Sequence, residues 1–147
     1  MCIVQVVNIF ATGLVAGAFF IGTFAVHPAA AKLDPGPHIV LRQELIRRLS
    51  RFLPPFMLSP IALALGALVI CRASVSLPLE AIGFALSLAT VGITVAVNTR
   101  LNRRFARWSP AALPRDWQEA VYRWNVAHFI RMMTALGAFA CAILAEG

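Results

Sequence analysis

The sequence predicts an all-α integral membrane protein, a four-helix bundle with an amphipathic interfacial helix between its first and second membrane helices. Two observations lead to this fold class. Of the 147 residues, 60% are hydrophobic and only 13% are charged, whereas a soluble domain is about one quarter charged. The basic residues also gather in two short stretches between apolar runs. Both features are typical of a chain whose solvent is the bilayer, and we expect one domain over residues 1–147.

Four apolar stretches are expected to cross the bilayer as helices. A crossing needs roughly 20 apolar residues, and the second stretch reaches that length only if the segment before it continues the helix. The first stretch has no basic region before it and is longer than the apolar part of a signal peptide. We therefore interpret it as a retained helix. The expected spans are about 3–26, 56–70, 79–97 and 126–144.

The loops predict the orientation of the chain. Five basic residues lie between the first and second spans, and six lie between the third and fourth, out of 13 in total. Four alternating spans place both loops on one side, and the positive-inside rule makes that side cytoplasmic. We expect a multi-pass protein of the cell's inner (plasma) membrane with both termini outside. The net charge of +7 then suits anionic lipid headgroups, and no motif predicts nucleic-acid binding.

The two basic connections carry further local signals. In the segment 38–53 most apolar side chains fall on one side of a helix and the basic ones largely on the other, which predicts the amphipathic interfacial helix. Pro54 and Pro55 should kink it into the second span. His38, which lies between prolines, is expected in a solvated loop. In the second connection, Asp116 can cap the helix that leads into the fourth span, and three tryptophans are expected at headgroup level: Trp108, Trp117 and Trp124.

Small and polar residues predict which helix faces meet inside the bundle, because no hydrophobic force drives helices together in lipid. The first helix has a Gly13/Gly17 pair, and we expect both glycines to pack closely against a neighbour. The expected inward faces are Gln5, Asn8, Thr12, Thr23 and His27 on the first helix, Gly83, Ser87, Thr90, Thr94 and Asn98 on the third, and Trp124, His128, Arg131, Ala135, Ala138 and Ala142 on the fourth. The three cysteines are expected to be inert thiols: Cys2, Cys71 and Cys141.

The most costly residues in the membrane point to a candidate site. Arg131 lies about one turn inside the fourth helix, where a charge costs several kcal/mol unless it is paired or hydrated. His27 ends the first helix, Asn98 ends the third, and His128 begins the fourth, so the expected topology places all four at the same depth. Two structural readings stay open: Arg131 could snorkel to the surface, and His128 could simply bond a neighbouring carbonyl.

At these residues the sequence resembles the small four-helix membrane proteins of the anthrone oxygenase-like family. The resemblance rests on GLVAGAFFIGTFAVHP at 13–28, VNTRLNRRFARW at 97–108, PAALPRDW at 110–117 and RWNVAHFIRMMTALGAFA at 123–140. It covers essentially the whole chain, and many members carry only an unknown-function label. The resemblance implies a membrane-associated oxygenase, a monooxygenase-type oxidoreductase acting on a polycyclic phenolic anthrone. The family pattern falls on His27, Asn98, Trp124, His128 and Arg131.

Chemistry suggests a role for each of these residues. Oxidation of an anthrone needs a base, a cation and an apolar pocket. We expect His128 to be the base that removes a proton from the activated methylene, and Arg131 to stabilise the enolate or peroxide. Asn98 and His27 would orient the substrate oxygens, and Trp124 would wall the pocket. The expected partners are the lipid bilayer and a small hydrophobic aromatic substrate, no metal or other cofactor is expected, and a homo-oligomer stays open.

Two other functions remain open at the level of sequence. His27 and His128 on separate helices could ligate haem or a metal, which would make the chain a redox protein. Alternatively, the chain could be a non-enzymatic accessory protein of a membrane complex. Hydrolases and phosphate-transfer enzymes are disfavoured, because the sequence has no GxSxG, P-loop or HExxH motif.

Overall fold

The computed structural model describes residues 3–70 and 76–146, and every regular element in these ranges is a helix. Four helical rods result, each long and apolar enough to cross a membrane. The predicted all-α four-helix membrane bundle is therefore confirmed. The rods consist of α1 (Ile3–Ile21), η1 (Gly22–Val26) and α2 (His27–Ala30); α3 (Pro35–Ile70); α4 (Leu77–Ile93), η2 (Thr94–Asn98) and α5 (Thr99–Phe105); and α6 (Trp117–Leu144).

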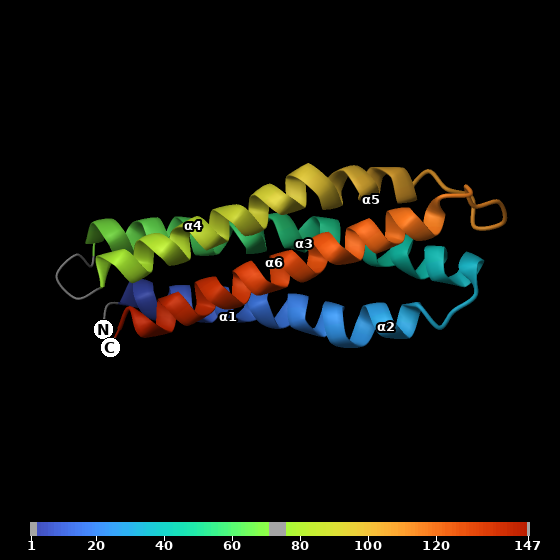
Figure 1. The fold of residues 1–147 in the computed structure, drawn as a ribbon. Coiled ribbons are helices and arrows are strands. Elements are labelled where there is room, and N and C mark those ends of the chain that lie inside the picture. The colour runs from blue at the N-terminus through green and yellow to red at the C-terminus, as the bar shows by residue number, and fades with distance from the viewer. Residues whose placement is uncertain (1–2, 71–75, 147) are drawn as a thin grey trace.

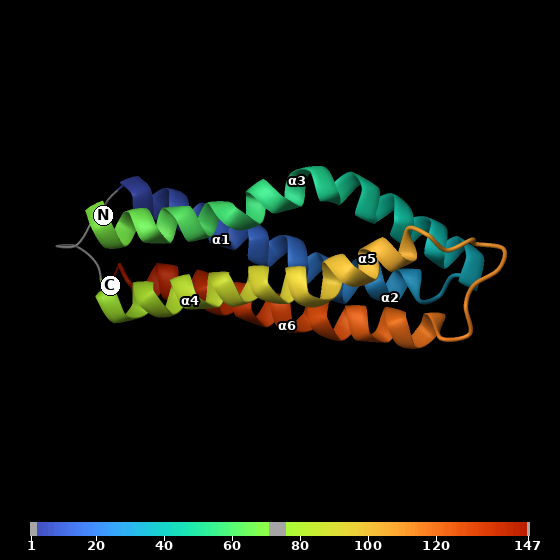
Figure 2. The same ribbon diagram turned by 90° about the horizontal axis from the view of Figure 1, so that it is seen from above.

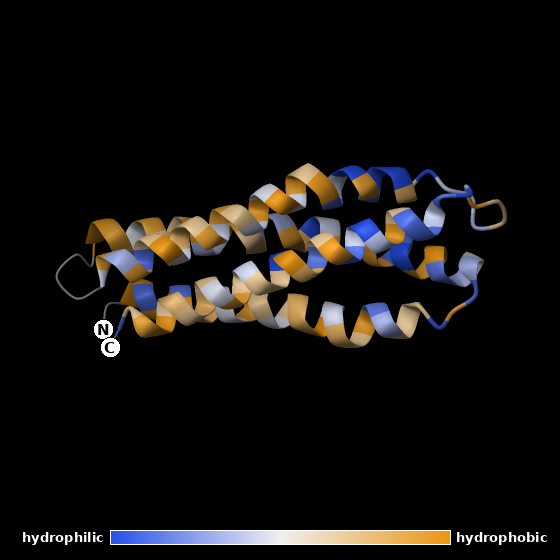
Figure 3. Cartoon of the chain, in the orientation of Figure 1, coloured by the Kyte–Doolittle hydropathy of each residue, from blue (hydrophilic) through white to orange (hydrophobic). Residues whose placement is uncertain are grey.

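The rods lie side by side and alternate in direction, so that both termini are at one end of the bundle (Figures 1 and 2). The connections 31–34 and 106–116 are at the other end. Helix α6 packs against both α1 and α4. Hydrophilic residues are concentrated at the end with these two connections, above all along α5 (Figure 3). The charge asymmetry of the sequence is thus an asymmetry between the two ends of the bundle.

The predicted amphipathic segment is helical and runs without interruption into the second span. Pro54, Pro55 and Pro60 all lie inside α3, and the helix bends along its middle part (Figure 2). A bend is expected there because each proline lacks the N–H that would bond the preceding turn. The first turns of α3 pack onto the bundle, where Ile39 is fully buried against Phe105. Apolar packing therefore fixes this segment as an extension of the second rod.

The predicted inward faces are largely confirmed by burial. Every residue predicted for the face of α6 is buried. On the first rod Gln5, Asn8 and Thr12 are buried, whereas His27 and Thr23 are only partly buried. On α4 the buried positions include Gly83, Ser87 and Thr90. The interior of the bundle is accordingly lined by small and polar side chains, as membrane helix packing requires.

The two glycines of the predicted packing pair behave differently. A Cβ atom on Gly13 would lie 2.9 Å from the Phe139 ring of α6, so this glycine does allow close packing. A Cβ atom on Gly17 would meet nothing within 4 Å. The prediction for Gly17 was wrong, because Gly17 lies on the exposed face of α1, whereas Val15 and Ala16 form the buried face of that turn.

Two expectations for the connections also need correction. Asp116 directly precedes α6 as predicted, but its side chain makes no cap hydrogen bond. It accepts a hydrogen bond from Arg104 at 2.6 Å instead, and this guanidinium holds the pKa of the Asp116 carboxyl below its usual range.

Trp124 does not lie at the surface, because only 8% of it is exposed. Of the cysteines, Cys141 is a free thiol, and Cys2 and Cys71 lie outside the described residues.

Candidate functional site

Two short π-helical segments mark the site. Segment η1 directly precedes His27, and segment η2 ends at Asn98. A π turn contains one residue more than an α turn, which widens the helix locally and re-aims its side chains, and such turns occur frequently at functional sites. Both segments pack against α6. The two irregular turns therefore lie on either side of the helix that carries His128 and Arg131.

Trp124 is the centre of an aromatic cluster formed by α6 and the first rod. The indole stacks on the His128 ring, with 5.0 Å between centroids and 11° between planes. The His27 ring meets the indole edge-on at 4.9 Å. The indole N–H donates a hydrogen bond of 2.7 Å to Asn102 Oδ1 of α5. Stacking on His128, the edge-on contact with His27 and the hydrogen bond from the indole N–H together fix the orientation of Trp124.

Arg131 and His128 form a hydrogen-bonded pair in the interior. Arg131 Nη2 lies 2.6 Å from His128 Nδ1, and Arg131 Nη1 donates to Thr94 Oγ1 at 3.1 Å. A guanidinium can only donate, so Nδ1 must be the acceptor. The other ring nitrogen, Nε2, then carries the proton and donates to the Phe19 carbonyl at 3.2 Å. His128 is a neutral imidazole in this geometry, and both of its nitrogens are engaged.

These contacts decide between the structural alternatives left open for Arg131 and His128. Arg131 does not snorkel, because only 2% of it is exposed and its guanidinium lies 4.7 Å above the Phe19 ring. His128 does bond a neighbouring carbonyl, but it holds the arginine at the same time. The pair therefore places a cation inside the apolar bundle.

Asn98 and His27 complete the set that the sequence predicted. Asn98 is fully buried and donates from Nδ2 to the Trp124 carbonyl at 3.2 Å, while its Oδ1 has no partner. His27 is partly exposed, and its Nε2 is buried without a hydrogen-bond partner. The His27 and His128 rings meet edge-on, with centroids 4.6 Å apart. The structure therefore brings the four polar residues together around Trp124.

Arg42 belongs to the same cluster, although the sequence analysis did not single it out as a site residue. Only 5% of it is exposed, and its guanidinium lies 4.7 Å from the centre of the Trp124 ring. Nη2 donates to Asn125 Oδ1 at 3.2 Å. A signal was present: Ile39, Arg42 and Ile46 are spaced by three and four residues, so they share one face of a helix. The buried Ile39 takes Arg42 into the interior with it.

His38 was misplaced by the sequence analysis. It lies in the first turn of α3 rather than in a loop, and only 4% of it is exposed. Its ring meets Trp117 edge-on, with centroids 5.7 Å apart. His38 is therefore buried beside the site and is not solvated.

The two buried arginines give the site an uncompensated positive charge. In residues 3–70 and 76–146, the ion pairs involve only Arg47, Arg48 and Arg104. Neither Arg42 nor Arg131 pairs with a carboxylate there, and the Nε atom of each is buried without a partner. A buried unpaired cation is costly, so an anion in the cluster would be strongly stabilised.

Gly22 makes room for the histidines. A Cβ atom at this position would lie 2.7 Å from His128 Nε2 and 3.5 Å from His27 Nε2. The π turn and the missing side chain therefore allow the backbone of η1 to approach the imidazole closely.

Possible metal ligands are sparse in the described part of the chain. Among the described residues, no group of three or more His, Cys, Asp or Glu side chains lies close enough to hold a metal ion. The two axial imidazoles of a haem lie on opposite faces of a flat macrocycle. The rings of His27 and His128 touch edge to face, so they would have to separate before a macrocycle could lie between them.

Comparison with known proteins gives one match. The family model described as anthrone oxygenase matches residues 43–141 of the chain. No curated protein and no solved structure matches it. The matched range contains Asn98, Trp124, His128 and Arg131, whereas His27 and Arg42 lie before its first residue.

Proposed function

The chain belongs to the anthrone oxygenase family, and we propose that it oxidises a polycyclic phenolic anthrone to the corresponding quinone with O2 inside the membrane. A base removes one proton from the activated methylene and leaves an electron-rich enolate. The enolate carbon forms a C–O bond with O2, which is reduced to a hydroperoxide. The O–O bond then breaks, the second methylene hydrogen leaves as a proton, and water is released as the carbonyl forms.

Two residues are proposed to stabilise the developing negative charge. Arg131 has a buried Nε without a partner, and a guanidinium binds phenolate and enolate oxygens well. Arg42 lies over the Trp124 ring and also lacks a carboxylate partner. In an apolar interior such fixed cations act strongly on charge that appears during the reaction. Both arginines would therefore favour the enolate over the neutral anthrone.

The base is one of the two histidines, and the hydrogen bonds favour His27. The sequence analysis assigned this role to His128, but both of its ring nitrogens are engaged with Arg131 and Phe19. His27 Nε2 has no partner and lies in the same cluster. We therefore propose that His27 accepts the proton and that His128 positions Arg131. The assignment to His128 stays a prediction, which the experiment below separates from this one.

Access from the lipid phase fits the proposed substrate. His27 is partly exposed, whereas Trp124, His128 and Arg131 are buried. A hydrophobic polycyclic phenol dissolves in the bilayer and would reach the cluster from the side of His27. Asn98, whose Oδ1 is unpartnered, and Trp124 are proposed to orient and wall the substrate.

The proposal rests on one observation. Two buried guanidinium groups, neither of which has a carboxylate partner among the described residues, lie beside an imidazole whose Nε2 makes no hydrogen bond. To test it, oxygen uptake and quinone formation from a model anthrone would be measured with detergent-solubilised protein, against a control without protein. Wild type should exceed that control clearly. Arg131→Ala should lose on the order of 100-fold in rate, and so should the alanine variant of whichever histidine is the base. A positioned base or cation contributes about that much.

His27→Ala and His128→Ala identify the base by their pH profiles. Loss of the base should abolish the pH dependence that an imidazole imposes on the rate, while loss of a positioning histidine lowers the rate at every pH. Arg47→Ala is the matched control, since Arg47 is exposed and pairs with Glu44. If wild type does not exceed the control without protein, the enzyme proposal fails and an accessory role is favoured. A haem absorption band in the purified protein would instead favour the redox alternative.

A further inference from the structure

Four arginines line an open groove at the end of the bundle that carries the basic connections. The groove has a volume of about 430 Å³, and its walls are Arg100, Arg103, Arg104, Arg107 and Trp108. All four arginines are exposed. They come from α5 and the turn that follows it, where the colouring of Figure 3 is most hydrophilic. This groove shares no residue with the cluster around Trp124.

Most of the positive charge in the groove is not neutralised by the protein. Arg104 pairs with Asp116, with 2.6 Å between Nη2 and Oδ2. In the part of the chain that the structure describes, the other three arginines make no ion pair. Three guanidinium groups within eight residues of sequence therefore face one cavity without a counter-ion from the chain.

The wall of the groove is rigid where it meets the bundle. The Trp108 ring packs on the fully buried Phe105, with centroids 4.8 Å apart, and the Arg104 guanidinium lies 5.7 Å from the Trp108 ring. Gln43 of α3 donates to the carbonyls of Phe105 and Trp108 at 2.8 and 3.0 Å. These contacts hold the end of α5 in place, so the groove is a formed feature of the fold.

The groove lies at the end of a rod that can span a membrane. Helix α5 ends the rod Leu77–Phe105, which is long and apolar enough to cross a membrane. Large apolar side chains such as Leu88 and Val95 are exposed along that rod. Phospholipid headgroups lie where an apolar span ends, and tryptophan is enriched at that level.

We propose that this groove binds the phosphate headgroup of an anionic phospholipid, whose acyl chains lie along the exposed apolar surface of α4. The planar fork of a guanidinium donates two parallel hydrogen bonds to a phosphate. A zwitterionic lipid offers the same phosphate but adds its own cation, which the arginines repel. The groove therefore selects lipids that carry a net negative charge.

The test is lipid retention, measured by native mass spectrometry after extraction from nanodiscs of phosphatidylcholine with and without phosphatidylglycerol. Wild type should retain phosphatidylglycerol in preference to phosphatidylcholine. The triple variant R100Q/R103Q/R107Q should bind it roughly 100-fold more weakly, because each basic residue near the headgroups contributes about fivefold. Arg104 is kept, so that its ion pair with Asp116 still holds the connection.

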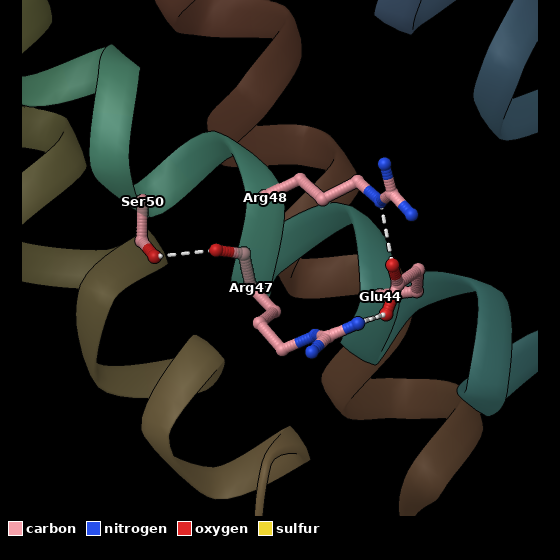
Figure 4. A network of polar contacts seen from close by, with 4 residues as sticks. All are labelled: Glu44, Arg47, Arg48 and Ser50. Carbon is pink, nitrogen blue, oxygen red and sulfur yellow. Dashed lines mark hydrogen bonds and ion pairs between the residues drawn. The ribbon is translucent and has the colours of Figure 1, made fainter.

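A matched control removes the same charge from the same end of the bundle. R47Q/R48Q/R51Q replaces three exposed arginines of α3, two of which already share Glu44 as a partner, each at 2.5 Å (Figure 4). This variant should retain the lipid. Equal loss in both triple variants would overturn the proposal, because net charge alone would then explain binding. Retention of free phosphate in place of lipid, or no preference in wild type, would overturn it as well.

Discussion

At the scale of single residues, the site depends on a set of linked contacts. Arg131 holds His128, His128 holds the carbonyl of Phe19, and Trp124 is fixed by Asn102. Each of these contacts orients a side chain of the site. They lie in an interior where an unpaired donor costs about 1–3 kcal/mol. A change of less than 1 Å at one member should therefore reach the others.

Gly22→Ala tests this dependence with a single methyl group. The new Cβ atom would lie 2.7 Å from His128 Nε2, so the imidazole or the backbone of η1 must shift, and we expect this shift to disturb the hydrogen bond from His128 to Phe19. Oxidation of the model anthrone should slow by on the order of 100-fold, the usual effect of a displaced catalytic group. Circular dichroism should show an unchanged helix content, because alanine favours helix more than glycine does.

Gly17→Ala is the matched control for this substitution. It adds the same methyl group on the same rod, but nothing lies within 4 Å of the new atom. Its activity should equal that of wild type. Equal activity of the two alanine variants would show that His128 tolerates displacement, and the assigned geometry would be wrong.

At the scale of elements, the two π segments decide where the site lies. Segments η1 and η2 flank α6 at His27 and Asn98, and between them they position residues from three rods. A π turn is an α-helix with one inserted residue, so its removal restores a regular helix without rotating the flanking turns. This property allows the π turn to be tested separately from the fold.

Deletion of Val95 should convert η2 into a regular α turn. Val95 is exposed toward lipid, so its own side chain makes no interior contact, and thermal stability should fall less than after a deletion in regular helix. The rate of anthrone oxidation should fall at least about tenfold, because Thr94 and Asn98 leave the positions from which they contact Arg131 and Trp124. Full activity of this variant would show that the π turn has no function.

A deletion in regular helix provides the contrast. Leu88 is also exposed toward lipid, but it lies within α4. Its removal rotates everything that follows by about 100°, which turns the inward face of the rod toward lipid. Thermal denaturation in detergent should show a larger loss of stability for this variant than for the Val95 deletion.

At the scale of the whole molecule, the bundle has two chemically different ends. The termini share one end, and the basic connections share the other (Figures 1 and 3). The positive-inside rule predicts that the basic end faces the cytoplasm. The candidate site and the arginine groove would then lie toward the cytoplasmic side of the membrane.

Fusion reporters test this orientation. Alkaline phosphatase fused after Gly147 should be active in a bacterial host, because the enzyme folds only outside the cytoplasm, and green fluorescent protein fused there should stay dark. The same reporters inserted at Ala111 in the connection 106–116 should give the opposite result. Fluorescence from the C-terminal fusion would show that the orientation is reversed.

The sequence alone determined the fold class, the inward faces of the helices and most of the candidate site. Hydropathy and charge are properties of short stretches of sequence, so they can be read along the chain without knowing what each residue contacts. Helical spacing extends that reading to one face of each rod, which is why Asn98, His128 and Arg131 could be grouped before any contact was known.

Only the tertiary structure decided which residues lie inside at the basic end. His38 looked solvated and Arg42 was not singled out, yet the packing of Ile39 on Phe105 takes both into the interior. Gly17 looked like a packing residue, yet it lies on the exposed face of its helix, and a Cβ atom there would meet nothing within 4 Å. The π turns depend on which carbonyl each N–H reaches, and no residue type specifies that choice. Burial and hydrogen-bond partners arise from contacts between distant segments, and for that reason the state of His128 and the free nitrogen of His27 could not be predicted from the order of residues.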